Sequence, residues 1–386
     1  MRYKIKRPII SFLLILTILT ILPLHVQAQP DEQVQPDVSA QSSILMDAFT
    51  GTVLYEKDAD SQMLIASTTK IMTALVVIEN CNLEDTLTVK TEYTLVEGSS
   101  MYLKAGEKLK VRDVLYGLML SSGNDAAVAL ACHIAGSIED FAEIMNAKAK
   151  QLGMSNSSFK NPHGLDTDGH YSTAKDMAVL TVAAMNNYDF AQVVSTKSIN
   201  VAGRYLTNHN KLLWKYDGAL GVKTGFTKSA GRSLVSCAER DGMRLVCVTL
   251  NAPDDWDDHS ALYNWGFENY KYECPIKKGQ VIAEVPVISG QEDTVQIVTE
   301  DGMSLLLGDS DTVETVINAP KFIYAGIESG QNAGSIAVIV NGEVVQEIGL
   351  IFNGDAKLDE SESLTFWEQV KWKINNVISE KFAIFN

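Results

Sequence analysis

The pattern of hydrophobic and polar positions in the first two thirds of the chain predicts helices packed against a sheet. Apolar runs at 44–46 and 53–55 flank a polar stretch that contains a glycine, which predicts an opening β-hairpin. Residues 71–78 are apolar on nearly every side, so we expect a helix buried at the centre of a domain. Helical periodicity at 111–120 and 125–134 predicts two further helices joined by a polar turn.

The region that follows combines a long polar loop with a second set of elements. Residues 156–170 are rich in Ser, Asn, Gly and Asp, and a loop of this length inside a compact domain is usually functional or disordered. Ser172 is the expected N-cap of a helix that extends to residue 186. Strand-like runs and then a helical stretch follow at 220–226, 233–238, 243–250 and 260–270.

Beyond Cys274 the pattern changes to short alternating runs. These runs lie at 281–287, 294–298, 335–340 and 344–350. The last two are joined by Asn341-Gly342, a strong signal for a two-residue hairpin. We therefore expect a catalytic domain over residues 41–272 and a small all-β domain over residues 273–353.

The two ends of the chain read as export and membrane signals. Residues 1–28 have a basic head, an apolar middle and small residues at the end, the order of a cleaved secretory signal. An uncleaved anchor is the alternative, and in either case the remainder leaves the cytoplasm. Residues 29–40 are polar and read as a flexible leader. Residues 354–386 predict an acidic linker and an amphipathic helix suited to a membrane interface, or packed on the β domain or a partner.

Composition excludes some classes of function. The formal net charge is −16, and removal of the basic signal makes the remainder more acidic, so nucleic acid is excluded as a partner. The cysteines form no CxxC pair and have no histidines at ligand spacing, so we expect neither a metal site nor a dense disulfide framework. Cys237 and Cys247 lie on a predicted hairpin whose register decides whether they can pair, and buried free thiols are favoured.

Ser67 and Lys70 form an S-x-x-K pattern at the start of the predicted buried helix. This spacing puts both side chains on one face of the first turn. The N–H groups at a helix start can stabilise an oxyanion, and burial can lower the pKa of a lysine until it acts as a base. The same pattern occurs at Ser157 and Ser172, in the loop and at a helix start, so it does not single out Ser67 by itself.

Two motifs farther along the chain distinguish Ser67 from the other two serines. Ser122-Gly123-Asn124 lies in the turn between two predicted helices, and Lys223-Thr224-Gly225 lies on a predicted strand. An S-x-x-K, S-x-N and K-T-G series in this order is a strong signal of serine acyl-enzyme chemistry. Such chemistry uses no cofactor and no metal, and we expect neither.

On these motifs the chain resembles the low-molecular-mass penicillin-binding proteins that act as D-alanyl-D-alanine carboxypeptidases. The likeness spans about residues 41–272 and includes AFTGTVLYEKDAD, ASTTKIMTAL, LMLSSGNDAAVALA, NPHGLDTDGHYSTAKDMA, GVKTGFTKSAGRSLV and YNWGFENY. It implies an α/β (α+β) fold of the β-lactamase/transpeptidase type, in which helices flank an antiparallel sheet beside a helical subdomain. A small all-β domain and a C-terminal amphipathic helix also match the family's usual layout.

The resemblance implies catalytic roles for the motif residues. Ser67 would attack the carbonyl between two D-alanines, and Lys70 would take the serine proton. Ser122 would pass a proton toward the leaving amine. Asn124 would hold the substrate peptide and position the lysine.

The resemblance also implies a substrate-binding strand formed by Lys223, Thr224, Gly225 and Phe226. Lys223 would keep the catalytic lysine partly neutral and attract the free carboxylate of the substrate. Thr224 would form a hydrogen bond with that carboxylate. The N–H groups of Ser67 and Phe226 would form the oxyanion hole.

The chain departs from the family pattern at positions that bear on substrate preference. Ile65 stands where proline is common, and Leu220 stands where aspartate is frequent. A run with four aspartates at 254–258 occupies a stretch in which some members have an arginine. His163 and His170 lie in the long loop, but their spacing does not fit a zinc site, and the resemblance implies a structural role for this loop.

The implied partners are peptidoglycan stem peptides, β-lactam antibiotics as acylating inhibitors, and a membrane surface bound by the C-terminal helix, at the outer face of the cytoplasmic membrane or in the cell wall space. A β-lactamase is one alternative, but the E-x-x-L-N segment that such enzymes use is absent between Asn124 and Lys223. Residues 143–146 lack the leucine and read as helix. A catalytically idle wall-binding or scaffolding protein is the other alternative, and it would not need all three motifs.

Overall fold

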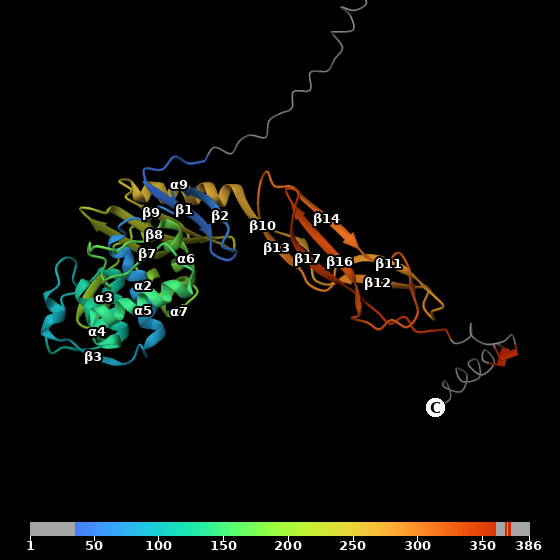
Figure 1. Ribbon diagram of the computed structural model, residues 1–386, viewed down its shortest axis with the longest axis horizontal. Coiled ribbons are helices and arrows are strands. Elements are labelled where there is room, and N and C mark those ends of the chain that lie inside the picture. The colour runs from blue at the N-terminus through green and yellow to red at the C-terminus, as the bar shows by residue number, and fades with distance from the viewer. Residues whose placement is uncertain (1–34, 360–366, 369, 372–386) are drawn as a thin grey trace, which may run out of the picture. The chain divides into compact units, whose positions relative to one another are not determined.

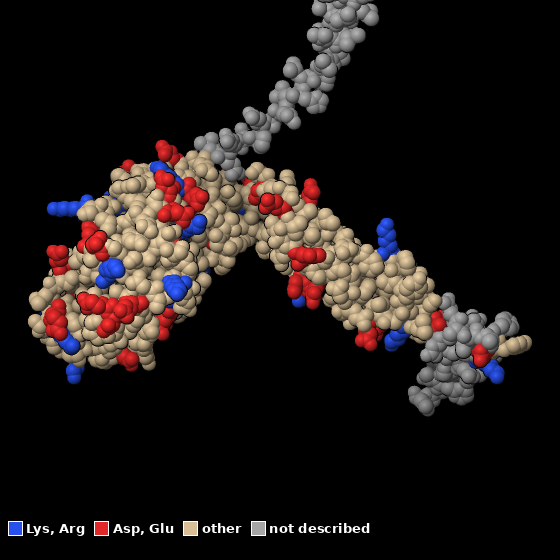
Figure 2. Space-filling view, viewed as in Figure 1, with Lys and Arg blue, Asp and Glu red and all other residues tan. Residues whose placement is uncertain are grey.

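The structure is a computed structural model that describes residues 35–359, 367, 368, 370 and 371 (Figure 1). The predicted signal at 1–28, the first half of the leader and most of the predicted C-terminal helix lie outside the described residues. Within the described part, no helix is long and apolar enough to cross a membrane. Acidic side chains are spread over the face drawn in Figure 2, in keeping with the net charge of −16.

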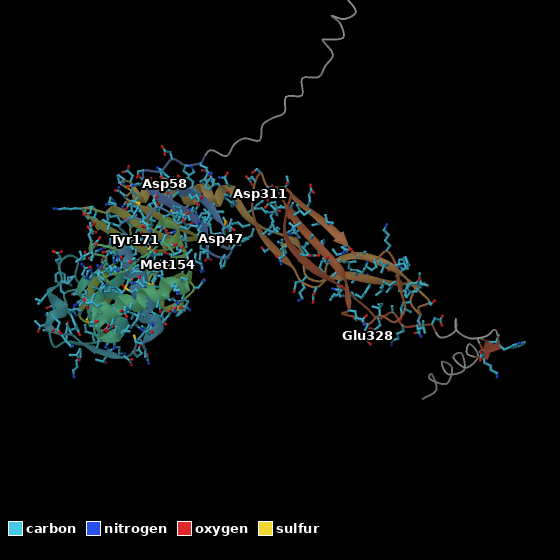
Figure 3. The ribbon with its side chains drawn as sticks, viewed as in Figure 1. Asp47, Asp58, Met154, Tyr171, Asp311 and Glu328 are labelled. Atoms are coloured by element: carbon cyan, nitrogen blue, oxygen red, sulfur yellow. The ribbon has the colours of Figure 1, made fainter. Side chains whose placement is uncertain are left out.

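A five-stranded antiparallel sheet forms the centre of the catalytic region, with the strand order β2-β1-β9-β8-β7. Its strands are β1 (Ser42–Asp47), β2 (Val53–Lys57), β7 (Ala219–Thr227), β8 (Gly231–Arg240) and β9 (Met243–Leu250). The predicted opening hairpin and the three predicted later strands are confirmed. Asp47 ends β1 and Asp58 follows β2, and both are labelled in Figure 3.

Helices cover this sheet and form two separate hydrophobic clusters with it. Their bounds are α2 (Lys70–Asn80), α3 (Val111–Leu120), α4 (Asn124–Ala135), α5 (Ile138–Gln151), α6 (Ala174–Met185), α7 (Tyr188–Ser195), α8 (Leu212–Lys215) and α9 (Asp255–Asn269). The larger cluster includes side chains of α2 to α7, whereas α9 contributes to the smaller one. Helices α2 to α7 pack together as the helical part of the catalytic region.

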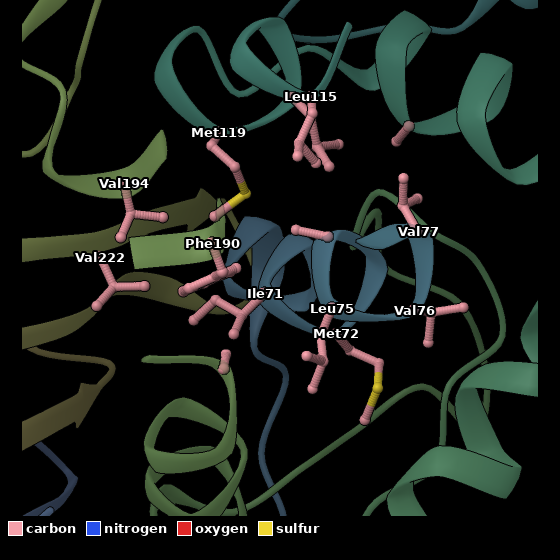
Figure 4. Close-up of a cluster of buried hydrophobic side chains, with 14 of the residues drawn as sticks. Ile71, Met72, Leu75, Val76, Val77, Leu115, Met119, Phe190, Val194 and Val222 are labelled. Atoms are coloured by element: carbon pink, nitrogen blue, oxygen red, sulfur yellow. The ribbon is translucent and has the colours of Figure 1, made fainter. Parts of the chain in front are cut away.

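The predicted central helix is confirmed as α2, which begins at Lys70. Figure 4 shows its side chains among those of α3, α7 and β7. Ile71 is fully buried, and Phe190 of α7 and Leu115 of α3 are fully buried in the same cluster. Burial of this many apolar side chains fixes the helix, and with it the lysine at its start, relative to the sheet.

Two predicted helix starts are wrong, for reasons of local chemistry. The N-cap of α6 is Thr173 and not Ser172, because the Thr173 hydroxyl accepts a hydrogen bond from the Asp176 N–H at 3.0 Å. Helix α9 starts at Asp255, earlier than the predicted start near residue 260. Three aspartates in its first turn favour the helix N-terminus, where the helix dipole is positive.

The register of β8 and β9 determines whether Cys237 and Cys247 can form a disulfide. Cys237 pairs with Val246 and Cys247 pairs with Ser236, so the two cysteines are not opposite each other. Cys237 belongs to the larger hydrophobic cluster and Cys247 to the smaller one. The predicted buried free thiols are confirmed, and the sheet register rules out the disulfide.

Four short strands within the catalytic region were not predicted, because runs of three or four residues give no usable pattern. They form the pairs β3 (Thr86–Thr88) with β4 (Lys108–Lys110), and β5 (Ser198–Val201) with β6 (Arg204–Thr207).

The small all-β domain is confirmed as a fold. Its six-stranded sheet contains β14 (Val313–Asn318), β16 (Asn332–Val340), β17 (Glu343–Phe352), β12 (Thr294–Thr299), β11 (Val281–Ile288) and β15 (Ile323–Tyr324), in that order. A further pair joins β10 (Tyr270–Ile276) to β13 (Met303–Gly308). The predicted hairpin at Asn341-Gly342 joins β16 to β17, with positive φ at both residues. Strand β10 crosses the predicted domain boundary at residue 272.

Candidate active site

Ser67 lies on a short 3-10 turn, Ala66–Thr69, that leads directly into α2. The sequence predicted that Ser67 lies in the first turn of the α-helix itself, whereas the structure places it in a tighter turn just before the helix. Ala66 has a φ of +47°, a conformation in which the surroundings must hold a non-glycine residue. As the second residue of the turn, Ser67 has an N–H with no acceptor inside the turn, so this group can point at a developing oxyanion.

Lys70 is completely buried, and its Nζ contacts three oxygen atoms. The Nζ donates to Ser67 Oγ at 2.9 Å, to Asn124 Oδ1 at 2.7 Å and to the His163 carbonyl at 2.7 Å. Burial lowers the pKa of Lys70 well below its ordinary value, and the nearby positive charge of Lys223 lowers it further. A lysine with this position and a lowered pKa can act as a base toward the serine hydroxyl.

The turn between α3 and α4 brings the second motif to the same place. Ser122 has a φ of +56° and is buried at the wall of the cavity that also contains Ser67. Asn124 is the first residue of α4, and its amide bridges Lys70 Nζ and the Glu97 carbonyl, to which Nδ2 donates at 2.7 Å. The amide therefore links the candidate base to the neighbouring loop.

Asp125, which the sequence analysis did not single out, holds that loop in place. Its Oδ1 accepts from the Met101 N–H at 3.0 Å, and its Oδ2 accepts from the Ser100 hydroxyl at 2.6 Å and the Leu103 N–H at 2.9 Å. A carboxylate with several donors from one segment stabilises the conformation of that segment. Asp125 thus supports the cavity wall that Ser99 forms.

The long polar loop after residue 156 packs against the turn that carries Ser67. Tyr171, labelled in Figure 3, closes the loop by two backbone hydrogen bonds to Ser158. Gly164 has a φ of +85°, and a Cβ there would lie 1.9 Å from the Ala66 carbonyl oxygen. Only glycine fits this close approach, because any side chain would displace the turn that carries Ser67.

The two histidines of this loop form structural contacts. His170 Nε2 lies 2.8 Å from Thr69 Oγ1, and His170 Nδ1 accepts from the Lys160 N–H, so Nε2 donates. His163 Nδ1 accepts from the Leu165 N–H at 3.1 Å, and it is the main-chain carbonyl of His163 that contacts Lys70. Burial lowers the pKa of His163 to about 3 and that of His170 to about 4, so both rings are neutral at physiological pH. This geometry is that of a structural loop.

The third motif lies on β7, beside the turn that carries Ser67. A methyl group at Gly225 would lie 3.0 Å from the Ile65 carbonyl oxygen and 3.2 Å from the Ser67 nitrogen, so the strand passes very close to the nucleophile. Lys223 is buried, its Nζ donates to the Thr224 carbonyl at 2.9 Å, and burial lowers its pKa to about 7. Phe226 is exposed at the rim of the cavity.

One cavity of about 690 Å³ connects most of these residues. It is lined by Ser67, Ser99, Ser122, Thr207, Asn208, His209, Lys211, Trp214, Thr224, Gly225, Phe226, Arg232, Asp255 and Trp256. Ser67, Ser122, Thr224, Gly225 and Phe226 are predicted site residues that line it, and Lys70 and Asn124 lie behind Ser67. Arg232, Asp255 and the two tryptophans were not predicted.

The fold also contains a buried serine–histidine pair, Ser236 and His259, but this serine is not a candidate nucleophile. Ser236 Oγ lies 2.6 Å from His259 Nδ1 and 2.6 Å from the Tyr263 hydroxyl, while His259 Nε2 lies 3.0 Å from Thr249 Oγ1. All four residues are buried between α9 and the sheet. Burial lowers the pKa of His259 to about 3, and no substrate reaches a network that is closed in this way.

Two family profiles together match most of the chain. The profile described as D-alanyl-D-alanine carboxypeptidase matches residues 29–254. The profile described as the C-terminal domain of penicillin-binding protein 5 matches residues 270–357.

Similar proteins match over most of their length as well. The D-alanyl-D-alanine carboxypeptidase DacF of Bacillus subtilis is 33% identical over 334 residues, which cover 82% of this chain and 86% of DacF. DacC of Escherichia coli, with the same description, is 34% identical over 336 residues, 82% of this chain and 84% of DacC. The crystal structure of penicillin-binding protein 5 from Haemophilus influenzae has a TM-score of 0.67 at 29% identity and covers 84% of this chain and 99% of that one.

Proposed function

This chain belongs to the D-alanyl-D-alanine carboxypeptidase family, and we propose that it uses Ser67 to remove the terminal D-alanine of peptidoglycan stem peptides. The activity class follows from the family, which makes the chain a serine peptidase. The assignment of individual residues is the proposal. One observation carries it: the buried Lys70 Nζ lies 2.9 Å from Ser67 Oγ, at the wall of the cavity.

In the proposed acylation step, Lys70 takes the Ser67 proton as Oγ attacks the carbonyl carbon between the two D-alanines. The N–H groups of Ser67 and Phe226 stabilise the oxyanion. The carbon–nitrogen bond then breaks, and the proton reaches the leaving amine through Ser122, which gives free D-alanine and an ester at Ser67. Water hydrolyses this ester, which returns the proton to the serine.

The substrate is held on the other side of the cleft by β7. Lys223 Nζ donates to the Thr224 carbonyl oxygen, and among the described residues Lys223 forms no ion pair with a carboxylate. A positive charge without an anionic partner favours a bound carboxylate. The Thr224 hydroxyl and the Asn124 amide complete the proposed peptide-binding groups, all within residues 41–272.

The proposal is tested by following the full-length wild-type protein with two probes. A pentapeptide that ends in D-alanyl-D-alanine should release one equivalent of free D-alanine and leave a tetrapeptide. Labelled penicillin should modify a single proteolytic fragment, the one that contains Ser67. Label on any other serine, or a peptide product that has lost more than one residue, would contradict the assignment.

The structure favours the carboxypeptidase over the β-lactamase alternative. The Lys70 ammonium contacts a hydroxyl, an amide oxygen and a main-chain carbonyl, and no carboxylate among the described residues lies within hydrogen-bond distance of it. Asn146, in the segment 143–146 that lacks the leucine of the E-x-x-L-N motif, lies on α5 and binds the Phe159 backbone. Penicillin should therefore be released slowly, over many minutes, which a time course of label retention measures.

We also propose that the protein is exported and bound to the outer face of the membrane by residues 364–386. The pattern of this segment supports the idea: Trp367 and Trp372 accompany lysines and apolar residues at helical spacing. Deletion of residues 364–386 should move the protein from the membrane fraction to the soluble fraction without loss of penicillin labelling. Unchanged fractionation of the truncated protein would refute the membrane role.

A further inference from the structure

The cavity extends past the nucleophile to an ion pair that the catalytic motifs do not include. Arg232 lies near the start of β8, and Asp255 is the first residue of α9. Arg232 Nη2 donates to Asp255 Oδ1 at 2.6 Å, and both residues line the same cavity as Ser67. The pair therefore lies where a bound substrate passes.

Asp255 orients the Arg232 guanidinium and leaves most of its N–H donors available. The Asp255 side chain is 3% exposed, whereas the Arg232 side chain is 42% exposed. A guanidinium has five N–H donors, and Asp255 takes one of them. The Arg232 Nε is buried and has no hydrogen-bond partner in the structure. The exposed N–H groups of the guanidinium are the donors that remain available to an acceptor on a bound ligand.

The sheet register places Arg232 close to the K-T-G strand. Arg232 is directly opposite Phe226, and Leu234 is directly opposite Thr224. Directly opposite residues share a face of the sheet and alternate residues return to it, so Thr224, Phe226 and Arg232 are on one face. Arg232 is thus the diagonal neighbour of Thr224, within reach of a long side chain.

The surroundings restrict the arginine to a narrow range of positions. Its Cζ lies 5.9 Å from the centre of the Trp256 ring, the residue after Asp255. The aromatic ring and the buried carboxylate both come from the start of α9, so the helix orients the guanidinium from two sides. A planar fork in a fixed orientation is suited to a carboxylate, with which it can form two parallel hydrogen bonds.

We propose that Arg232, oriented by Asp255, binds the free carboxylate of the substrate's terminal residue and so favours removal of that residue over cleavage at internal bonds. This inference rests on the proposed function, because it assigns a specificity-determining residue to the same cleft. Arg232 touches the leaving residue, Thr224 shares the carboxylate, and Asp255 is a positioning residue that acts through the arginine.

Two small thioesters that differ only in the carboxylate separate this role from a structural one. Both are N-acyl-D-alanyl thioesters, one with a leaving thiol that carries a free carboxylate and one with the methyl ester of that thiol. Their hydrolysis by the full-length protein is followed by release of thiol. Arg232→Gln should lower kcat/KM for the free acid about 10- to 100-fold, mainly through KM, and change the value for the methyl ester less than about threefold.

Further variants test the roles of charge, geometry and position. Arg232→Lys should recover only part of the loss, because an ammonium lacks the planar fork. Asp255→Asn should raise KM for the free acid alone, by a smaller factor than Arg232→Gln. Arg244→Gln is the matched control, since Arg244 forms a similar pair with Glu239 on the neighbouring strand, outside the cavity.

The outcomes distinguish the inference from the function on which it rests. Equal losses on both thioesters would assign the ion pair to stability of the fold. No loss on either thioester would show that Arg232 does not bind the leaving group. Each of these results would overturn the inference. If the wild-type protein hydrolyses neither thioester and is not labelled by penicillin, the proposed function itself fails.

Discussion

Replacement of Ser67 by alanine is expected to abolish covalent labelling by penicillin and to reduce D-alanine release on the order of 10⁴- to 10⁶-fold. The hydroxyl supplies the atom that forms the ester, and the donors that remain around it can only bind the substrate. Ser67 is partly exposed in the cavity wall, and its Oγ accepts a hydrogen bond from Lys70, so its removal leaves the fold intact. Fluorescent penicillin on a denaturing gel and a D-alanine assay measure the two effects.

Ser157 provides a control within the same chain. It carries the same S-x-x-K spacing, but its hydroxyl donates to Asp176 Oδ2 at 2.6 Å and contacts Ser172 Oγ at 2.7 Å. Ser157→Ala should be labelled like the wild type, with at most a small loss of stability. If Ser67→Ala is labelled and Ser157→Ala is not, the nucleophile has been misassigned.

Replacement of Lys70 by glutamine is expected to lower the acylation rate by roughly 10²- to 10⁴-fold, the usual contribution of a positioned general base. Glutamine keeps a polar group near Asn124 and the His163 carbonyl but cannot take the serine proton. Because burial and Lys223 lower the pKa of Lys70 well below its ordinary value, the wild-type lysine is deprotonated at a lower pH than a free one.

The pH profile of acylation tests the same assignment. The wild-type rate should fall as the pH drops and Lys70 gains a proton, and this dependence should disappear in Lys70→Gln. Lys175→Gln is the control, because Lys175 also ends an S-x-x-K pattern but pairs with Asp60 at the surface. A steep pH dependence that persists in Lys70→Gln would point to another base.

The sequence predicts the contacts of the site that side chains of the three motifs make, but not those that the backbone makes. Ser67 and Lys70 are three residues apart, so their contact follows from local geometry. The contact between Lys70 and Asn124 spans 54 residues and was accessible only because the order of motifs indicates it. The His163 carbonyl lies 93 residues from Lys70 and leaves no signal in the residue type, because any residue has a carbonyl.

The missed Arg232–Asp255 pair has a different cause. The predicted helix begins near residue 260 and leaves out the aspartates at 254–258, whereas α9 begins at Asp255. Recognition of the acidic first turn as a helix start would have placed Asp255 beside the sheet. The fold itself was easier to predict, since strands β7, β8 and β9 and the buried helix α2 are strongly apolar.

The close approach of Gly164 to Ala66 determines how a substitution at residue 164 affects the turn that carries Ser67. A substitution at a substrate-contacting residue changes one interaction, whereas any single-codon change that gives Gly164 a side chain pushes against the Ala66 carbonyl and the whole turn. Lys70 contacts the main-chain carbonyl of His163, the residue before Gly164, so this contact depends on the path of the backbone and not on the side chain at 163. We therefore expect substitutions of Gly164 to impair the site, although this residue does not line the cavity.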